Sequence, residues 1–450
     1  MLSKQSWIKP SDGLEFEWTQ AEQEGRNLTG KEKALIQAAL SAEGAEREEL
    51  AERAYQAVQA LGIRPDYPYQ EPSDLKGIQR EAAHTGPLKV NAGALEDKIY
   101  GAWLARCAGC LLGQPVEGWR SARINGLLKD TGNYPAKGYI SSDIAPEIRE
   151  RYGVKDGGQV YGSAHINWIN HVHWMPEDDD TNYTVIALKL LENYGMDFTP
   201  EDAAECWLMN LPYLHVCTAE RVAYRNLVMA KYPPLSASFA NPYREWIGAQ
   251  IRADLFGYVT PGKPALGAEL AWRDASMSHV KNGIYGEMWM AAMLSAAAVE
   301  SDVERILQIG LGEIPTKSRL HEAILVVMDW KKQGFTWEKA LEEIHARYDE
   351  ANGHDWCHTI SNAMIVAAAL LFGEKDLGMT LAIALQAGFD TDCNAASAGS
   401  VLGMILGAKE LPKAWTEPLN DTLISGVDGF GKVKISELAA RTTRLAEKNL

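Results

Sequence analysis

Two apolar stretches of this sequence carry small residues at every fourth position, and this spacing constrains the fold more than any other feature. The repeated positions are Gly101, Ala105, Gly109 and Gly113 in the first stretch and Gly399, Gly403 and Gly407 in the second. Positions four apart share one face of an α-helix, although an internal glycine costs a helix about 1 kcal/mol relative to alanine. A face without side chains lets another helix approach closely. We therefore predict two tightly packed central helices, which are candidates to pack against each other. Segments 114–117 and 390–394, at the ends of these helices, would then lie close together.

The rest of the chain is also predicted to be helical, because alternating β-branched runs closed by tight turns are nearly absent. Thr29 opens a capping box for a helix that is expected to reach about Leu61. Thr199, followed by a proline, and Thr336 are two further helix starts. Segment 118–175 is weakly periodic and rich in glycine, which predicts long loops with short helices.

A break in the helical pattern separates the start of the chain from the remainder. A stretch rich in proline and tyrosine, 64–73, follows the first helical region and is expected to be extended. The helical pattern resumes near Ala94. We therefore predict an N-terminal helical extension, residues 1–93, and a main domain, residues 94–450.

The acidic composition limits the kinds of partner that this protein can have. Its 450 residues carry a net charge of −16, which speaks against a nucleic acid bound through a broad basic surface. The longest apolar run, 363–372, is too short to span a membrane and predicts a buried helix. We recognise no secretion leader, and the six scattered cysteines fit reduced thiols. We expect a cytoplasmic protein without a nucleic-acid or membrane partner, and the sequence leaves its oligomeric state open.

The first candidate functional segment is a run of four carboxylates at residues 177–180, directly before a predicted amphipathic helix. One aspartate there would suffice to cap the helix. Adjacent carboxylates repel one another unless a cation neutralises them. The run therefore favours metal binding over capping alone.

The second candidate segment is a tight turn in which Asp390 and Asp392 stand two positions apart, before the second glycine-stepped helix. An Asx-turn with a helix cap is the alternative interpretation. Two aspartate clusters at two helix starts together favour a shared centre for hard cations, because carboxylates suit magnesium, manganese or calcium rather than zinc. Two divalent ions sharing a carboxylate would lie roughly 3.5–4 Å apart.

Three segments resemble the ADP-ribosylglycohydrolase family, which includes the dinitrogenase reductase-activating glycohydrolases and the J1 crystallins. Segment 99–117 resembles the family's opening helix and the turn after it. Asp179-Asp180-Thr181 matches an Asp-Asp-Thr motif, and segment 388–399 matches a late Gly-x-Asp-Thr-Asp motif followed by small residues. Ser278-His279 resembles a weaker Thr-His motif. The likeness covers roughly residues 94–410 and leaves the N-terminal extension outside.

This resemblance implies an all-α, orthogonal multi-helix bundle with two magnesium or manganese ions per chain. By position, the implied metal ligands are Asp178, Asp179, Asp180, Asp390, Asp392 and Cys393. Asp178 stands where the family usually has Thr or Ser, Cys393 where it often has Thr, and Cys110 where it often has Asp. A thiol is a poor magnesium ligand, so whether Cys393 coordinates stays open, and Asp178 could supply the missing oxygen.

The family's reaction assigns roles to further residues. Hydrolysis through an oxocarbenium-like state needs a proton for the leaving group or a base for water, and the catalytic candidates are Glu117, Asp179 and Asp392. The substrate-binding candidates are His279, His165, Asn282 and Gly283. Each of these also has a plain structural interpretation, as a packed histidine or a turn.

The sequence therefore predicts a hydrolase, a metal-dependent glycosylase that cleaves a ribosyl N- or O-glycosidic bond with water activated at a binuclear centre. Its partner would be a small ribosyl or ADP-ribosyl compound. One alternative is a glycosidase of nucleosides, nucleotides or other furanosyl compounds. A second alternative is a non-catalytic, crystallin-like or binding protein.

Overall fold

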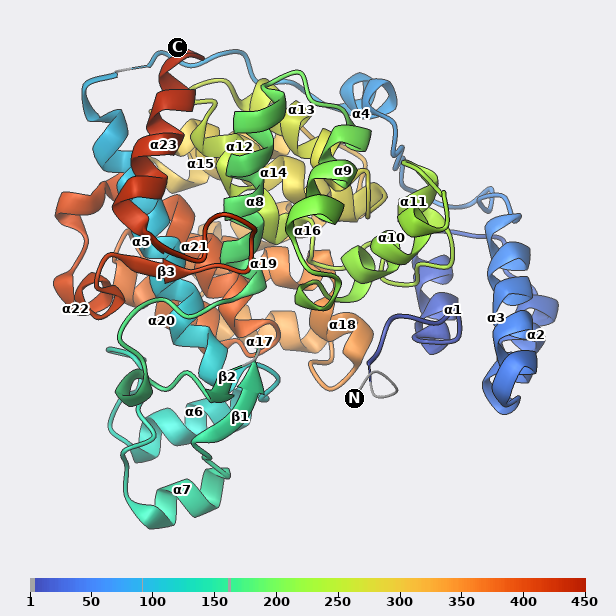
Figure 1. Cartoon of the computed structure of the whole chain (residues 1–450), viewed down its shortest axis with the longest axis horizontal. Coiled ribbons are helices and arrows are strands. Elements are labelled where there is room, and N and C mark those ends of the chain that lie inside the picture. The colour runs from blue at the N-terminus through green and yellow to red at the C-terminus, as the bar shows by residue number, and fades with distance from the viewer. Residues whose placement is uncertain (1–4, 91, 161–162) are drawn as a thin grey trace.

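The fold is an assembly of helices with two small β-hairpins at its surface (Figure 1). The computed structural model describes residues 5–90, 92–160 and 163–450, and the side chains in these ranges except those of residues 92, 158–160 and 163–165. The hairpins are antiparallel and pair β1 (Gly157–Val160) with β2 (Ser163–His165) and β3 (Thr422–Ile424) with β4 (Lys432–Lys434). The prediction of an all-α protein is confirmed.

Four helices precede the first glycine-stepped helix. They are α1 (Leu14–Gln23), α2 (Gly30–Ser41), α3 (Gly44–Gln59) and α4 (Leu75–Glu81). The capping box at Thr29 is present, but a single helix to Leu61 was a wrong prediction. Ala42 and Glu43 are extended and Gly44 has φ +59°, so the chain turns and starts a second helix. Helices α1 to α3 share a small apolar cluster of their own, at one end of the molecule (Figure 1).

The remaining helices surround one large core. Those of the first half are α5 (Leu95–Gly113), α6 (Ser121–Asp130), α7 (Pro146–Tyr152), α8 (Asp179–Tyr194), α9 (Pro200–Asn210), α10 (Thr218–Val228), α11 (Leu235–Ser238), α12 (Asp254–Tyr258) and α13 (Pro264–Ala275). Those of the second half are α14 (Lys281–Ala297), α15 (Val303–Leu311), α16 (Arg319–Lys332), α17 (Trp337–Arg347), α18 (Gly353–Cys357), α19 (Thr359–Phe372), α20 (Leu377–Gln386), α21 (Thr391–Leu406), α22 (Lys413–Thr416) and α23 (Ile435–Glu447). The predicted starts at Thr199 and Thr336 are confirmed as the caps of α9 and α17.

Seven short 3-10 turns connect these helices within the described ranges. They are Ala92–Ala94, Gln114–Val116, Ile169–His171, Tyr213–His215, Gln250–Arg252, Ala408–Glu410 and Glu417–Leu419. The predicted loop region 118–175 contains α6, α7, the first hairpin and one such turn. Long loops with short helices are therefore confirmed there, although the hairpin was not predicted.

The two glycine-stepped helices, α5 and α21, pack directly against each other, as predicted. A Cβ added at Gly101 would lie 2.6 Å from the carbonyl oxygen of Gly403, and one added at Gly399 would lie 2.5 Å from that of Ala105. At the far end, a Cβ on Gly113 would collide with the backbone of Asp392. The backbones touch because the side chains are missing, and this contact sets the ends of α5 and α21 beside each other.

The apolar run at residues 363–372 lies in α19, which is buried along its whole length. Among the helices of the described residues, none combines the length and the apolar character that a membrane crossing requires. The hydrophobic helices of this chain form its core instead.

Candidate metal centre

The two acidic runs meet at one cavity of about 170 Å³, between the starts of α8 and α21 and the end of α5. Its acidic lining consists of Glu117, Asp178, Asp179, Glu220, Asp390 and Asp392, and we call it the acidic cavity. The predicted approach of segments 114–117 and 390–394 is confirmed, and the Thr391 hydroxyl also donates to the Gly113 carbonyl at 3.0 Å. Residues more than 200 positions apart thus share one site.

At the start of α8, one aspartate serves as the cap while its neighbours remain available. The Asp178 carboxylate accepts a hydrogen bond from the backbone N–H of Asp180 at 3.0 Å. The Gln114 amide also donates to Asp178 and is oriented by Asn167, 3.1 Å away. Asp178 is thus the helix cap, the Asp179 carboxylate shares the same N–H at 3.1 Å, and Glu177 accepts from the Asn182 amide at 3.0 Å.

Asp180 is held by a buried arginine that the sequence analysis missed. Arg106, on α5, is fully buried and donates to the Asp180 carbonyl at 2.6 Å and to the Asp254 carboxylate at 2.9 Å. Its guanidinium also lies 3.3 Å from the Asp180 carboxylate. The available signal was a lone charge inside an apolar, glycine-stepped helix, where an arginine has to meet a carboxylate.

At the start of α21, a sharp turn presents the second pair of aspartates. Gly388 and Phe389 both have positive φ, of +71° and +55°. Asp390 occupies the position before the helix, yet its side chain makes no capping hydrogen bond. The alternative interpretation, an Asx-turn with a cap, therefore lacks its defining contact.

The donor atoms of these segments form two groups that share Asp392. In the first group, Cys110, Asp178, Asp180 and Asp392 each place a ligand atom within 4.8 Å of the others. Asp390, Asp392 and Cys393 form the second group in the same way. All six residues are buried. Within the described residues, one carboxylate oxygen each of Asp180, Asp390 and Asp392 has no hydrogen-bond partner.

Burial and crowding make these carboxylates hard to ionise. Loss of hydration, followed by the charges of Asp178 and Asp180, raises the pKa of Asp179 well above its usual value. Loss of hydration, followed by the charges of Glu117 and Asp390, also raises the pKa of Asp392 well above its usual value. A divalent cation reverses such shifts, because it stabilises the ionised form. The orphaned oxygens and the oxygen-rich donor set fit hard cations.

Glu117 is exposed to solvent at the mouth of the acidic cavity. Loss of hydration, and then the charges of Asp390 and Asp178, raise its pKa to about 8. A carboxyl group with this pKa keeps its proton at neutral pH and is able to donate it.

Glu220, on α10, is a second acid in the cavity that the sequence analysis missed. Burial raises its pKa to about 7, although Arg252 opposes the shift and donates to it at 2.8 Å. The sequence around it is an ordinary amphipathic helix, so only the tertiary fold reveals this position.

The proposed substrate-binding residues lie elsewhere. His279 lines a separate cavity with Trp272, and its ring contacts the Ser278 hydroxyl at 2.8 Å. The Asn282 amide donates to Glu71 at 2.8 Å and Glu245 at 3.0 Å, and Gly283 packs closely on the Arg244 carbonyl. The structure does not bring these three residues into the acidic cavity. The side chain of His165 falls outside the described residues.

Comparison with known proteins gives one family. The family model described as ADP-ribosylglycohydrolase matches residues 91–449. A solved structure titled "ADP-ribosylglycohydrolase-related protein complex" is similar at 19% identity, covering 79% of this chain and 99% of that chain, with a TM-score of 0.47. No curated protein matches the chain.

Proposed function

The chain belongs to the ADP-ribosylglycohydrolase family and is a glycosylase-type hydrolase, and on this basis we propose that it cleaves a ribosyl N- or O-glycosidic bond at a binuclear magnesium or manganese centre. The observation that carries the proposal is that Asp178, Asp179, Asp390 and Asp392 line one cavity, while buried Asp178, Asp180 and Asp392 place their carboxylates within 4.8 Å of one another. Six acidic residues line this small cavity, and the arginines beside it, Arg252 at Glu220 and Arg106 at Asp180, balance only part of the negative charge.

The carboxylates of Asp178, Asp179, Asp180, Asp390 and Asp392 would hold the ions. Asp392 belongs to both donor groups, which suits a carboxylate shared by two ions. Cys393 is near enough to contribute, but a thiol is a poor ligand for magnesium. Asp178 would supply an additional oxygen in the other donor group, with Asp180 and Asp392.

The bound ions would supply charge neutralisation and a more acidic water. The side chains of the cavity do the remaining work. Glu117 holds a proton at the mouth, where a leaving group departs, and Glu220 is a second proton carrier deeper in the wall. Arg106 fixes the backbone and carboxylate of Asp180, so that the start of α8 does not shift.

The second candidate function is hydrolysis of a small nucleoside or nucleotide rather than of ADP-ribosyl protein. Aromatic residues Tyr183, Trp246 and Trp356 line the acidic cavity, and aromatic rings stack well on sugars and bases. A binding protein without activity is the third candidate. We also propose a cytoplasmic location, from the sparse cysteines, and a catalytic domain over residues 94–450 preceded by the extension 1–93.

A substrate panel tests the proposal. The full chain is incubated with manganese and with ADP-ribosyl-arginine, ADP-ribosyl-serine, O-acetyl-ADP-ribose, NAD and simple nucleosides, and free sugar is measured. We expect turnover of at least one compound, its loss in chelator, and its loss in Asp179→Asn. Turnover of nucleosides alone favours the second candidate, and turnover that persists in chelator contradicts the metal mechanism.

A further inference from the structure

The acidic cavity has one wall that comes from outside the residues matched to the family. Trp7 lines this cavity together with Asp178, Asp390 and Trp356, although the family match begins at residue 91. Figure 1 shows the N-terminal end of the chain beside α18, the helix that carries Trp356. The start of the chain therefore reaches the site that the main domain builds.

A buried arginine fixes Trp7 in this position. The Arg221 guanidinium lies 4.9 Å from the centre of the Trp7 ring, a distance typical of cation–π contacts. The same guanidinium donates to the Gln5 side chain at 3.2 Å and to the Ser6 carbonyl at 3.3 Å. Arg221 is itself 4% exposed and belongs to α10, which begins at the edge of the cavity with Thr218.

The backbone at Trp7 is held in an unfavourable conformation. Its φ is +65°, in the left-handed region, which a bulky residue other than glycine adopts only at a cost. The chain then makes a turn before α1. In this turn the Asp12 carboxylate accepts hydrogen bonds from the backbone N–H groups of Ile8 and Lys9, at 2.9 and 3.0 Å. Such strain persists where the surrounding contacts enforce it.

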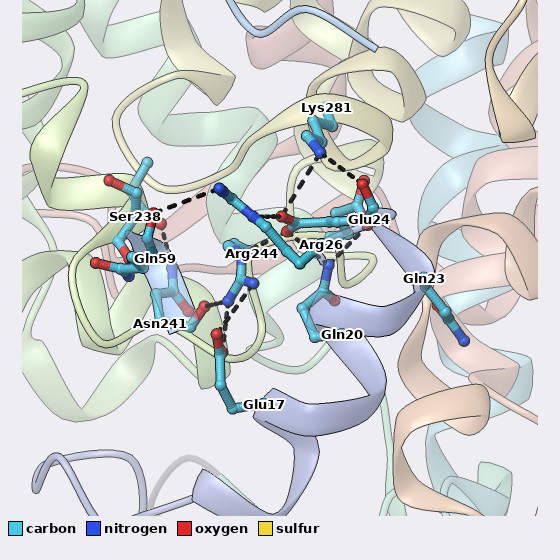
Figure 2. Close-up of polar contacts among 12 residues, drawn as sticks. Glu17, Gln20, Gln23, Glu24, Arg26, Gln59, Ser238, Asn241, Arg244 and Lys281 are labelled. Carbon is cyan, nitrogen blue, oxygen red and sulfur yellow. Dashed lines mark hydrogen bonds and ion pairs between the residues drawn. The ribbon is translucent and has the colours of Figure 1, made fainter. Parts of the chain in front are cut away.

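The contacts that anchor the extension are buried ion pairs between α1 and the main domain (Figure 2). Arg244 pairs with both Glu17 and Glu24 at 2.6 Å, and all three side chains are nearly inaccessible to solvent. Gln20 links Glu24, at 3.0 Å, to Glu245, at 2.7 Å. We call this set, with the further partners Arg26, Lys281, Arg319 and Glu71, the extension network.

Helix α1 also packs on a second tryptophan that lines the cavity. The Phe16 ring packs edge-on against Trp246, with centroids 5.2 Å apart, and Trp246 lines the cavity. The extension therefore supports Trp246 and supplies Trp7, two aromatic residues that line the cavity.

We propose that the N-terminal extension completes the active site, and that Trp7 is a specificity-determining residue that stacks on a planar group of the substrate, such as a nucleobase. This inference rests on the proposed function and adds the substrate class: ribosyl compounds that carry a planar ring. The carboxylates of the acidic cavity would bind the polar sugar of the substrate. The apolar face of the Trp7 ring would stack on a flat, weakly hydrated group of the same substrate.

The test compares two ligands that differ in the planar group. Dissociation constants of ADP-ribose and of ribose 5-phosphate are measured by calorimetry on the full chain with manganese. For Trp7→Ala we expect ADP-ribose to bind about tenfold more weakly, because the stacking contact with the base is lost. Binding of ribose 5-phosphate stays within about twofold, and Trp7→Phe, which keeps a ring, falls between wild type and Trp7→Ala for ADP-ribose.

Trp18→Ala is the matched control, because Trp18 is also on the extension but packs on the α1–α3 cluster. It should change neither constant. A Trp7→Ala protein that binds both ligands more weakly by the same factor, or binds both as wild type does, overturns the role of Trp7 and leaves the proposed function standing. A wild-type protein that binds neither ligand overturns both. If Trp7→Ala does not fold, an unchanged ratio of the two constants in Trp7→Phe overturns the inference.

Discussion

The extension network and the acidic cavity are both buried clusters of carboxylates, and they differ in what balances the charge. In the extension network four glutamates face four cations of the same chain: Glu17, Glu24, Glu71 and Glu245 against Arg26, Arg244, Lys281 and Arg319. In the acidic cavity the carboxylates face mainly one another.

The pKa values show the consequence of this difference. Burial alone would raise the pKa of Glu24, but Arg244 and Lys281 hold it at about 2. Burial and neighbouring carboxylates instead raise the pKa of Asp179 and Asp392. This difference supports the proposal that the acidic cavity binds a positively charged ligand.

The largest expected effect comes from removing a shared ligand. We expect Asp392→Asn to lower turnover by more than about 100-fold, because even outer-shell changes at metal sites cost 10- to 100-fold. The free energy of unfolding of the metal-free protein should not fall, because the lost charge had no partner. Turnover and urea denaturation in chelator measure both. A large loss of stability in chelator would mean that the charge was balanced by the chain.

Breaking the extension network should instead lower the free energy of unfolding. Arg244→Met leaves Glu17 and Glu24 without their main partner, and we expect unfolding to become easier by about 3–5 kcal/mol. The control Lys339→Met removes an exposed pair with Glu343 and should leave the free energy of unfolding nearly unchanged. Equal effects of the two changes, in urea denaturation, would show that the network is not a buried anchor.

Acid should weaken the extension network through Glu24. Its folded pKa of about 2 lies below the ordinary 4.5, so its stabilising effect is complete above pH 4.5 and is lost as the pH falls towards 2. The difference in unfolding free energy between wild type and Glu24→Gln should therefore shrink from pH 7 to pH 3, by an amount on the order of 2 kcal/mol. Burial raises the pKa of Glu17 and the charge of Glu24 adds to this shift, so the measured difference also contains the coupling between the two glutamates. A difference that grows in acid contradicts this assignment.

The smallest expected effect concerns the contact that brings the two acidic runs together. A Cβ at Gly109 would collide with the backbone of Ala395, so Gly109→Ala should cost about 1–3 kcal/mol and weaken manganese binding. Gly30→Ala is the control, because no described heavy atom lies within 4 Å of a Cβ there. Calorimetric titration with manganese and thermal unfolding measure both properties. Unchanged manganese affinity in Gly109→Ala would show that helix contact and ion site are independent.

Local patterns predicted much of this fold. The steps of four residues in 101–113 and 399–407 predicted two closely packed helices, because glycine weakens a helix and is tolerated in such a row where a second backbone packs against it. They left open that the partner of α5 is α21. Capping residues predicted the starts of α2, α9 and α17. The approach of segments 114–117 and 390–394 followed from these helices, whereas the joining of residues 178–180 with 390–392 was predicted from the repulsion within two clusters of carboxylates.

The parts that sequence analysis missed depend on long-range contacts. Arg106 and Glu220 enter the site only because α5 and α10 converge on α8 and its cavity. Trp7 is one aromatic residue in a short N-terminal stretch, and nothing local indicates that Arg221 holds it. His279 and Asn282 resembled site residues by order along the chain, yet they face other partners in space.

Crystals of the full chain grown with manganese, measured at a wavelength where manganese scatters anomalously, test the central claim most directly. The account predicts about two ions per chain in the acidic cavity, bound by carboxylates from both the 178–180 and the 390–392 segments. Strong diffraction data at saturating manganese without an anomalous peak in that cavity would contradict it.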